Sequence, residues 1–391
     1  VIVTSQQDID ELEKDIHSSQ DFSKIQGRFN TRLSLSSANA DEVIKKRLLE
    51  KNDTGKDAVQ LLYTSEVKAS LRNKINFSDG TISLKKYDTL KDFSEFYPMI
   101  PYQLDLLQQV FTKIRENSSA GKHFASGERN LLGAVQYAAL EYAEKDLGIL
   151  IPFQTFYGHL DQGLDHSVRA TIIKAQSTPT LQSFDVDVLK VLYLIRYLKS
   201  VPSTVENITT LMLDELDADR LKLTENITAA LDRLTKEYLV QRTGLEYLFL
   251  TNEEQDINRE INHMDIPTSK MQSYIGEMIY DTVLEMKKYK YVPFAEKKTV
   301  AYDFDCAKWI DESARGNATA EIGIHVVTPY SDDYRTREEL QQLSSRESRL
   351  VIALGDSGTF YDDTMMLLKI NEYLRSQSSK QNSGIKREII D

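Results

Sequence analysis

The sequence predicts a mostly helical fold with smaller α/β parts, and three observations support this prediction. Apolar residues recur three and four positions apart over much of 61–182, which is the period of helices packed in a bundle. Residues 183–260 have the pattern of three short helices followed by a hairpin. Over 261–391, strand-like runs alternate with helical ones, which is typical of a small α/β domain ending in a polar tail.

The composition is that of an ordinary globular protein. Hydrophobic residues make up 41% and charged residues 28% of the 391 positions. No apolar run approaches the roughly 18 residues of a membrane span, so no membrane partner is expected. The single cysteine, Cys306, excludes an internal disulfide and disfavours a zinc site, so we expect a cytoplasmic location. Because the chain opens without Met inside a strand-like run, it is expected to be a fragment of a longer protein.

The first six residues, VIVTSQ, form an apolar run that ends in small polar side chains. This pattern is typical of a buried parallel strand whose carboxyl end faces a ligand crevice. Ser5 and Gln6 at that end either position a water molecule or simply terminate the strand.

Arg28 and Arg32 lie around an aromatic residue in a predicted loop, just before an alternating strand at 32–36. Asn39 is then expected to cap a helix over about 40–51. A loop arginine beside a strand is either a solvated surface charge or a group that reaches a partner. The local pattern alone favours the solvated charge.

Arg129 belongs to the motif SGERNLL, which opens a predicted helix in the bundle. A cation in the first turn of a helix opposes the helix dipole, so this arginine suggests an anionic partner. The alternative is an ion pair with Glu128 or another carboxylate. No GxxxxGK[ST] motif occurs anywhere in the sequence, and Gly121-Lys122 is interpreted as a loop.

The segment 183–260 is interpreted as a winged helix-turn-helix, with its third helix starting near Thr224 and its hairpin turning at Thr243-Gly244. Between Asp185 and Glu260, 15 acidic residues outnumber 9 basic ones. That surface suits a phosphate backbone poorly. Either the wing and its Arg242 contact DNA, or the module binds protein.

Other candidate sites are weaker. His159 and His166 are seven residues apart and lack a third metal ligand, so they are interpreted as polar positions near a domain junction. The run Gly355-Asp356-Ser357-Gly358 follows a predicted strand but differs from the GxSxG nucleophile motif, so a turn is expected. The α/β region has no predicted chemistry.

Taken in order, these segments resemble the second half of an AAA+ ATPase followed by a winged helix. VIVTSQQ resembles the sensor 1 strand, KIQGRFNTRLSLSS the arginine-finger segment, and SGERNLL the sensor 2 start of a lid helix. The resemblance implies that residues 1–60 are the C-terminal part of the ATPase core and that 61–182 are its helical lid.

A closer resemblance, over the whole chain, is to the BREX phage-defence P-loop family BrxC/PglY. It is carried by FYPMIPYQLDLLQQVF, HFASGERNLLGAVQYAAL and KIQGRFNTRLSLSSANADEVIKKRLLEK. This resemblance implies an ATP- and Mg²⁺-dependent ATPase that acts with other BREX components, as a homo-oligomer through its AAA+ part, to restrict phage DNA. The family's Walker A and B segments are absent, so the chain alone is expected neither to hydrolyse ATP nor to bind it tightly.

The resemblance also assigns roles to the candidate residues. Arg28 or Arg32 would be the arginine finger, with Arg28 favoured because it lies farther from the strand. Ser5 or Gln6 would orient the attacking water, and Arg129 would be the sensor 2 arginine. The competing hypothesis is a scaffold that binds protein or DNA and in which nucleotide is incidental.

Overall fold

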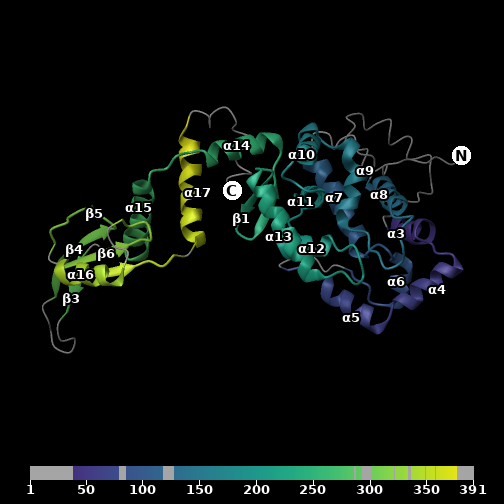
Figure 1. Cartoon of the computed structure of the whole chain (residues 1–391), viewed down its shortest axis with the longest axis horizontal. Helices are drawn as coiled ribbons and strands as arrows, with labels where there is room; N and C mark the ends of the chain where they lie inside the picture. The colour runs from purple at the N-terminus through teal and green to yellow at the C-terminus, as the bar shows by residue number, and fades with distance from the viewer. Residues whose placement is uncertain are drawn as a thin grey trace, which may run out of the picture. The chain divides into compact units, whose positions relative to one another are not determined.

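A computed structural model describes residues 38–78, 85–117, 127–285, 288–292, 301–320, 322–332, 336–347, 349–356 and 358–376 (Figure 1). The chain divides into two compact units, and the boundary falls after Gln255. The described residues are mostly helical, with a small mixed sheet in the second unit. None of the helices in these ranges has both the length and the apolar character needed to cross a membrane.

The first unit begins with short helices. They are α3 (Ala38–Val43), the π-helical turn η1 (Ile44–Leu48), α4 (Asp53–Leu62), α5 (Ser65–Lys74) and α6 (Leu90–Phe96). The side chains of Asn52, Thr64 and Thr89 cap α4, α5 and α6 by accepting backbone N–H bonds. The predicted helix over 40–51 starts earlier, so Asn39 lies inside α3 and not at its cap, and the helical turns end at Leu48.

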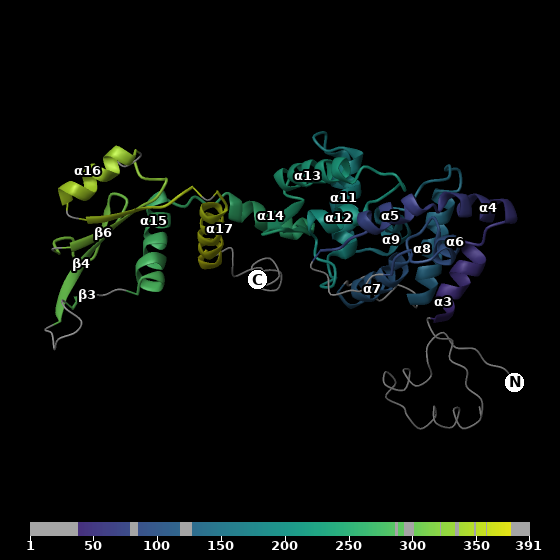
Figure 2. The same ribbon diagram turned by 90° about the horizontal axis from the view of Figure 1, so that it is seen from below.

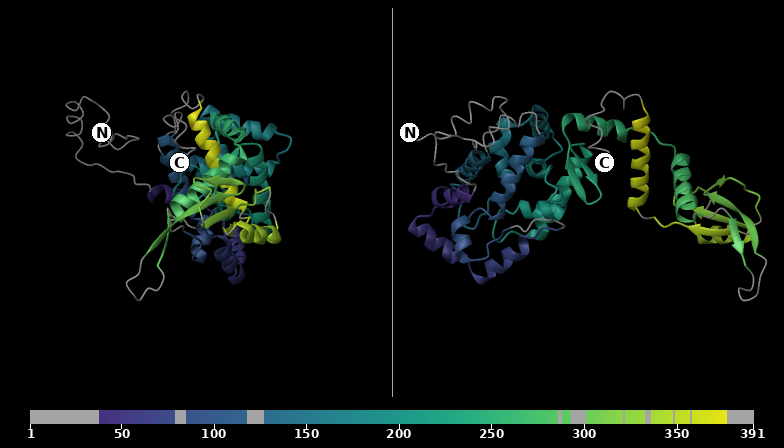
Figure 3. Two further views of the ribbon diagram at one scale, coloured as in Figure 1. Left: turned by 90° about the vertical axis from the view of Figure 1, so that its left-hand side faces the viewer. Right: turned by 180° about the vertical axis from the view of Figure 1, so that it is seen from behind.

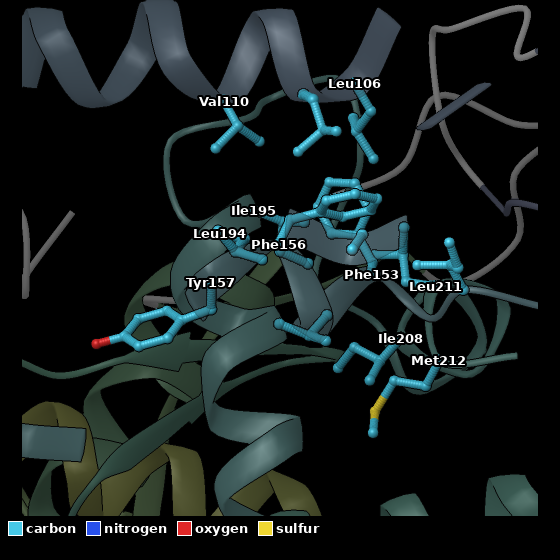
Figure 4. Packing of buried hydrophobic residues seen from close by; sticks show 14 of the residues in the cluster. Leu106, Val110, Phe153, Phe156, Tyr157, Leu194, Ile195, Ile208, Leu211 and Met212 are labelled. Atoms are coloured by element: carbon cyan, nitrogen blue, oxygen red, sulfur yellow. The ribbon is translucent and has the colours of Figure 1, made fainter. Parts of the chain in front are cut away.

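Two longer helices follow, α7 (Tyr102–Asn117) and α8 (Gly127–Glu141), and they pack against each other. The amphipathic face predicted for the first is confirmed, because Leu104, Leu107 and Val110 are all buried. The chain continues through η3 (Phe153–Phe156), α9 (Tyr157–Leu160), η4 (Asp161–Gly163) and α10 (His166–Ser177). Figure 4 shows part of the apolar core, including side chains of α7 and η3.

Three more helices and a hairpin complete the first unit. They are α11 (Ser183–Ile195), α12 (Val205–Leu211), α13 (Arg220–Lys236), β1 (Val240–Thr243) and β2 (Glu246–Phe249). The antiparallel pairing of Thr243 with Glu246 confirms the predicted hairpin turn. However, α13 begins at Arg220 and not near Thr224, because Asp219 caps it by accepting from the N–H groups of Leu221 and Lys222. Seen from behind in Figure 3, the purple helices α4 and α5 lie beside the blue-to-teal helices of the same unit.

The second unit combines helices with a mixed sheet. Its helices are α15 (Thr268–Glu277), the π-helical turn η5 (Met278–Val283), α16 (Arg337–Glu347) and α17 (Gly358–Arg375), and the unit boundary falls within α14 (Asn252–Asn262). Its strands are β3 (Lys288–Tyr291), β4 (Tyr302–Ile310), β5 (Ser313–Arg315), β6 (Ile322–Val327) and β7 (Arg349–Ala353).

The sheet order is β3-β4-β6-β7, and β5 also pairs with β4. The pairs β4–β6 and β6–β7 are parallel, whereas β3 and β5 run antiparallel to β4. Ile310, Ile324 and Val326 face the apolar cluster that includes residues of α15, η5 and α17. Helix α16 packs against β7 on the opposite face of the sheet (Figure 2).

Candidate functional site

Most of the predicted nucleotide-site residues lie outside the described part of the chain. Ser5, Gln6, Arg28 and Arg32 all precede residue 38, where the described structure begins. Arg129 lies in the first turn of α8, as predicted, although its side chain is not among those described. Its proposed anionic partner and the alternative ion pair with Glu128 therefore both stay predictions.

Helix α8 is held firmly in the first unit. Leu131, Ala134 and Val135 are all fully buried against neighbouring helices. A Cβ atom on Gly133 would lie 2.5 Å from Cε1 of His159, so only glycine allows α8 to approach α9 this closely. The helix that carries Arg129 is thus fixed by close packing over its described residues from Leu131 to Val135.

His159 is part of this packing. Burial lowers the pKa of its imidazole, so the ring stays neutral near pH 7. Among the described residues, no group of His, Cys, Asp and Glu side chains could hold a metal ion. His159 therefore serves the contact between α8 and α9, and His166 begins α10.

An ion pair joins the first and third helices of the segment predicted as a winged helix. Asp185 is fully buried and also accepts a hydrogen bond from the backbone N–H of Gln182, which closes the first turn of α11. Arg233 of α13 donates from Nε and Nη2 to the two carboxylate oxygens of Asp185, at 2.8 and 2.6 Å. A bidentate pair of this kind fixes the crossing of the two helices.

The exposed surface of α13 is balanced in charge. Its exposed charged side chains are two cations and two anions, namely Lys222, Lys236, Glu225 and Asp232. On the hairpin, the guanidinium of Arg242 lies 5.9 Å from the ring of Tyr247 and donates to the carbonyl of Gly244. Neither element presents the cluster of cations that a phosphate backbone requires.

A buried amide joins this segment to the helices that precede it. Asn207 of α12 is fully buried, and its Nδ2 donates to the carbonyls of Pro202 and Ser78 at 2.8 and 3.1 Å. Its Oδ1 accepts from the backbone N–H of Ser78 at 2.9 Å. All these groups have partners, which is how a buried amide becomes a specific link between two segments.

Further polar contacts run along the same junction. Arg220 of α13 donates to the carbonyl of Lys74, and the Lys74 ammonium donates to the carbonyl of Leu216 at 2.9 Å. Thr210 donates to the carbonyl of Asn76 at 2.5 Å. We call this set the polar seam: Lys74, Asn76, Ser78, Asn207, Thr210 and Arg220. It ties the end of α5 to α12 and α13.

In the second unit, a buried carboxylate lies where the parallel strands end. Asp311 follows β4, is fully buried and has a positive φ of 47°. Its carboxylate accepts from the N–H and hydroxyl of Thr328, at 2.6 and 2.8 Å, and from Gln272 Nε2 at 2.8 Å. Burial raises the pKa of this carboxyl, while the hydrogen bonds oppose that change. With its acceptors occupied, Asp311 fixes the edge of the sheet and offers no open site.

A stack of aromatic and cationic side chains crosses the sheet beside Asp311. His325 of β6 lies 5.9 Å from the ring of Trp309 on β4, and its Nε2 lies 2.6 Å from the carbonyl of Asp311. The guanidinium of Arg349 lies 4.0 Å from the Trp309 ring centroid. Gly323 leaves room for this stack, because a Cβ there would lie 3.1 Å from the Arg349 side chain.

The sequence analysis assigned no chemistry to this unit, so Asp311 and His325 were missed. In the structure β4 extends to Ile310, and this end of the strand is what places the polar Asp311 at the edge of the sheet. The predicted turn at Gly355 fits the structure, because β7 ends at Ala353 and α17 begins at Gly358, while Ser357 lies outside the described residues.

One comparison with known proteins bears on the second unit. Residues 264–391 match the family model described as the BREX ATP-binding protein BrxC 4th domain with six-stranded beta sheet. The strands β3 to β7 all lie within the matched segment. No solved structure matches the chain.

Proposed function

We propose that this chain belongs to the BREX BrxC family, whose model matches residues 264–391, and that it acts in phage defence as the regulatory part of an ATP-driven assembly that restricts phage DNA. In this proposal residues 1–60 complete an AAA+ core, 61–182 form its lid, 183–260 form a winged helix and 261–391 contact partners. The family match is the observation that carries the proposal.

In this proposal five residues take part in the nucleotide chemistry. Arg28 or Arg32 would stabilise negative charge on the transferring phosphoryl group from across a subunit boundary. Ser5 or Gln6 would orient the attacking water. Arg129 would contact phosphate from the first turn of α8, where a cation and the positive end of a helix together suit an anion.

ATP and Mg²⁺ would be held largely by a different segment. The sequence contains no GxxxxGK[ST] motif, which is the loop whose backbone amides and lysine hold phosphates. We therefore propose that turnover needs a Walker-bearing segment and a homo-oligomer in which one subunit's arginine reaches its neighbour's nucleotide. Other BREX components would use the turnover.

The polar seam supports a route from the lid to the winged helix. The seam links the end of α5 and the residues after it to α12 and α13 through partly buried hydrogen bonds. A movement of the lid helices on nucleotide hydrolysis would then carry α12 and α13 with it, because breaking several of these hydrogen bonds costs more than moving the joined helices together.

A scaffold is the second candidate function, and the surface of the winged-helix segment favours it. The exposed charges of α13 balance, while Leu221 and Leu245 are 78% and 74% exposed. An exposed leucine on the third helix and another at the hairpin turn suit a protein partner better than a phosphate backbone. In this alternative, nucleotide is incidental.

Phage plating on cells that carry a complete BREX system tests the proposal. Arg28→Ala, Arg32→Ala and Arg129→Ala would be compared with Arg72→Ala, an exposed arginine of α5 that serves as the matched control. Loss of a finger arginine lowers phosphoryl transfer by roughly 10³-fold or more, so protection should fail with Arg28→Ala or Arg32→Ala and persist with Arg72→Ala. Immunoblots would establish equal protein levels.

The same assay separates the two functions. If the scaffold hypothesis holds, all three arginine variants protect normally, whereas Leu221→Asp or Leu245→Asp abolishes protection. If the ATPase hypothesis holds, Arg28→Ala or Arg32→Ala fails to protect, whatever the leucine variants do.

A further inference from the structure

A small polar cavity lies between α8, η3, α9 and α11 in the first unit, and it is separate from the proposed nucleotide site. Its volume is about 140 Å³. Three tyrosines, two carboxylates and an amide contribute to its wall: Tyr137, Tyr142, Tyr157, Glu141, Asp187 and Gln154. Figure 4 shows Tyr157 directed away from the other labelled side chains of the core, with its hydroxyl at the outer end.

We propose that this cavity binds the side chain of an arginine supplied by a partner protein. The proposal rests on the cavity alone and is independent of the function proposed above. A guanidinium is planar, carries only donors and stacks on aromatic rings, so it requires acceptors, negative charge and ring faces in one place.

The acceptors are present. Gln154 Oε1 is buried and accepts no hydrogen bond from any described residue. A buried acceptor without a donor is costly, and a ligand that donates to it removes that cost. The hydroxyls of Tyr142 and Tyr157 are hydrogen-bonded to Thr155 and Asp161, at 3.3 Å each. They therefore form part of the cavity wall and are not the acceptors proposed for the ligand.

The charge of the wall favours a cation. Lys190 donates to Asp187 at 2.8 Å, so that pair is balanced. Glu141 is exposed, accepts a hydrogen bond from the Tyr137 hydroxyl and forms no ion pair with any of the described residues, which leaves one net negative charge at the cavity. Burial raises the pKa of Tyr137 and Tyr142, and the charge of Glu141 raises both further, while a hydrogen bond with Thr155 opposes the change at Tyr142; both phenols therefore stay neutral.

The ring faces come from close packing around Gly158. A Cβ at Gly158 would lie 2.3 Å from the hydroxyl oxygen of Tyr137, so glycine lets this phenol lie directly against α9. Tyr137 as a whole residue is 40% exposed, which leaves part of its surface open to a ligand. A cation held against such a ring is attracted by its negative face.

Binding of N-acetyl-L-arginine amide to the purified chain, followed by saturation-transfer NMR and calorimetry, tests the proposal. The neutral isostere N-acetyl-citrulline amide is the ligand control. We expect a Kd on the order of 1 mM for the arginine probe, as for a small ligand with one charged anchor, and at least about tenfold weaker binding of citrulline.

Variants identify the site. Glu141→Gln should weaken arginine binding about fivefold, because a charge-assisted hydrogen bond becomes a neutral one. Gln154→Leu should weaken it by a similar factor through loss of the buried acceptor. Glu144→Gln, an exposed neighbour outside the cavity, should bind like the unmodified protein.

Three outcomes overturn the proposal. One is equal binding of the arginine and citrulline probes, which would indicate a neutral polar cavity. Another is an equal effect of Glu141→Gln and Glu144→Gln, which would indicate general surface charge. The third is the absence of arginine binding at ten times the expected Kd, which would leave the cavity to water. Circular dichroism would verify that Gln154→Leu is folded. Glu141→Gln tests the site independently of Gln154→Leu, because it changes an exposed side chain.

Discussion

Arg233 and Asp185 form a bidentate ion pair that joins α13 to the first turn of α11, with donor–acceptor distances of 2.8 and 2.6 Å. Asp185 is fully buried, whereas the Arg233 side chain is 31% exposed. Arg233 is therefore bound within the fold, and its guanidinium is not available to a nucleic acid.

Replacing Arg233 should destabilise the first unit strongly. Arg233→Ala leaves a buried carboxylate whose remaining partner is a backbone N–H, and we expect a loss of about 3 kcal/mol in the free energy of unfolding. Urea unfolding measures it. Arg242→Ala, which removes an exposed arginine from the hairpin, should change stability by less than about 0.5 kcal/mol. Equal effects of the two variants would contradict a structural role for the Arg233 pair.

The polar seam should depend on Asn207. Asn207→Ala removes four hydrogen bonds and leaves the N–H and hydroxyl of Ser78 and two carbonyls without this partner, so we expect a loss of about 2–4 kcal/mol. Asn226→Ala on the exposed side of α13 is the matched control and should be near neutral. Hydrogen exchange should also show faster exchange at Ser78 in the first variant alone. Unchanged protection there would mean that the seam does not hold this segment.

The contact between α8 and α9 should not tolerate a methyl group. In Gly133→Ala the new Cβ meets the His159 ring, so we expect a loss of about 1–3 kcal/mol from overpacking. When His159 is already replaced by Ala, adding Gly133→Ala should cost less stability than it does in the unmodified protein, because the ring that clashes with the new Cβ is gone. A double-mutant cycle on thermal unfolding measures the coupling, and strict additivity would contradict the predicted clash.

The second unit should lose stability as the pH falls below about 6.5. Burial, and then the Arg349 charge, lower the pKa of His325. A histidine in the unfolded chain has a pKa of about 6.5. Below that pH the unfolded chain therefore binds a proton more readily than the folded unit does, so the free energy of unfolding falls. Burial raises the pKa of Asp311, so its protonation acts in the opposite direction.

Trp309 reports this titration, because it is the single tryptophan of the chain and its ring lies beside His325. Its fluorescence should change with a midpoint below 6.5, and His325→Gln should abolish the change. His263→Gln, at an exposed histidine directly after α14, is the control and should keep it. A midpoint at or above 6.5 would contradict the lowered pKa.

Much of the helical part could be predicted from periodicity. The face of α7 is regular enough to give Leu104, Leu107 and Val110 correctly, and the Thr243-Gly244 turn located the hairpin. Helix starts were less accurate, because several polar residues compete to cap them. Asp219 caps α13, while the hydroxyl of Thr224 donates back to the carbonyl of Arg220 within the helix.

Other elements had no readable pattern. In α16 only Leu343 is buried, so the segment lacks the apolar repeat of a helix that packs on a core. The strand β3 alternates Lys and Tyr but is exposed throughout, and its pairing with β4 depends on contacts distant in sequence. The buried Asp311 resembled any polar residue after a strand, because its burial depends on Thr328 and Gln272 from other elements. The nucleotide residues before residue 38 stay predictions.

ATP turnover by mixed subunits tests the central claim most directly. The protein would carry both this chain and a Walker-bearing segment, with Arg28→Ala or Arg32→Ala in one preparation and a defective Walker lysine in the other. The account predicts that one of these arginine variants is inactive alone although it still binds nucleotide, and that mixing it with Walker-defective subunits restores part of the rate. Full turnover by Arg28→Ala, Arg32→Ala and Arg129→Ala, with no gain on mixing, would contradict it.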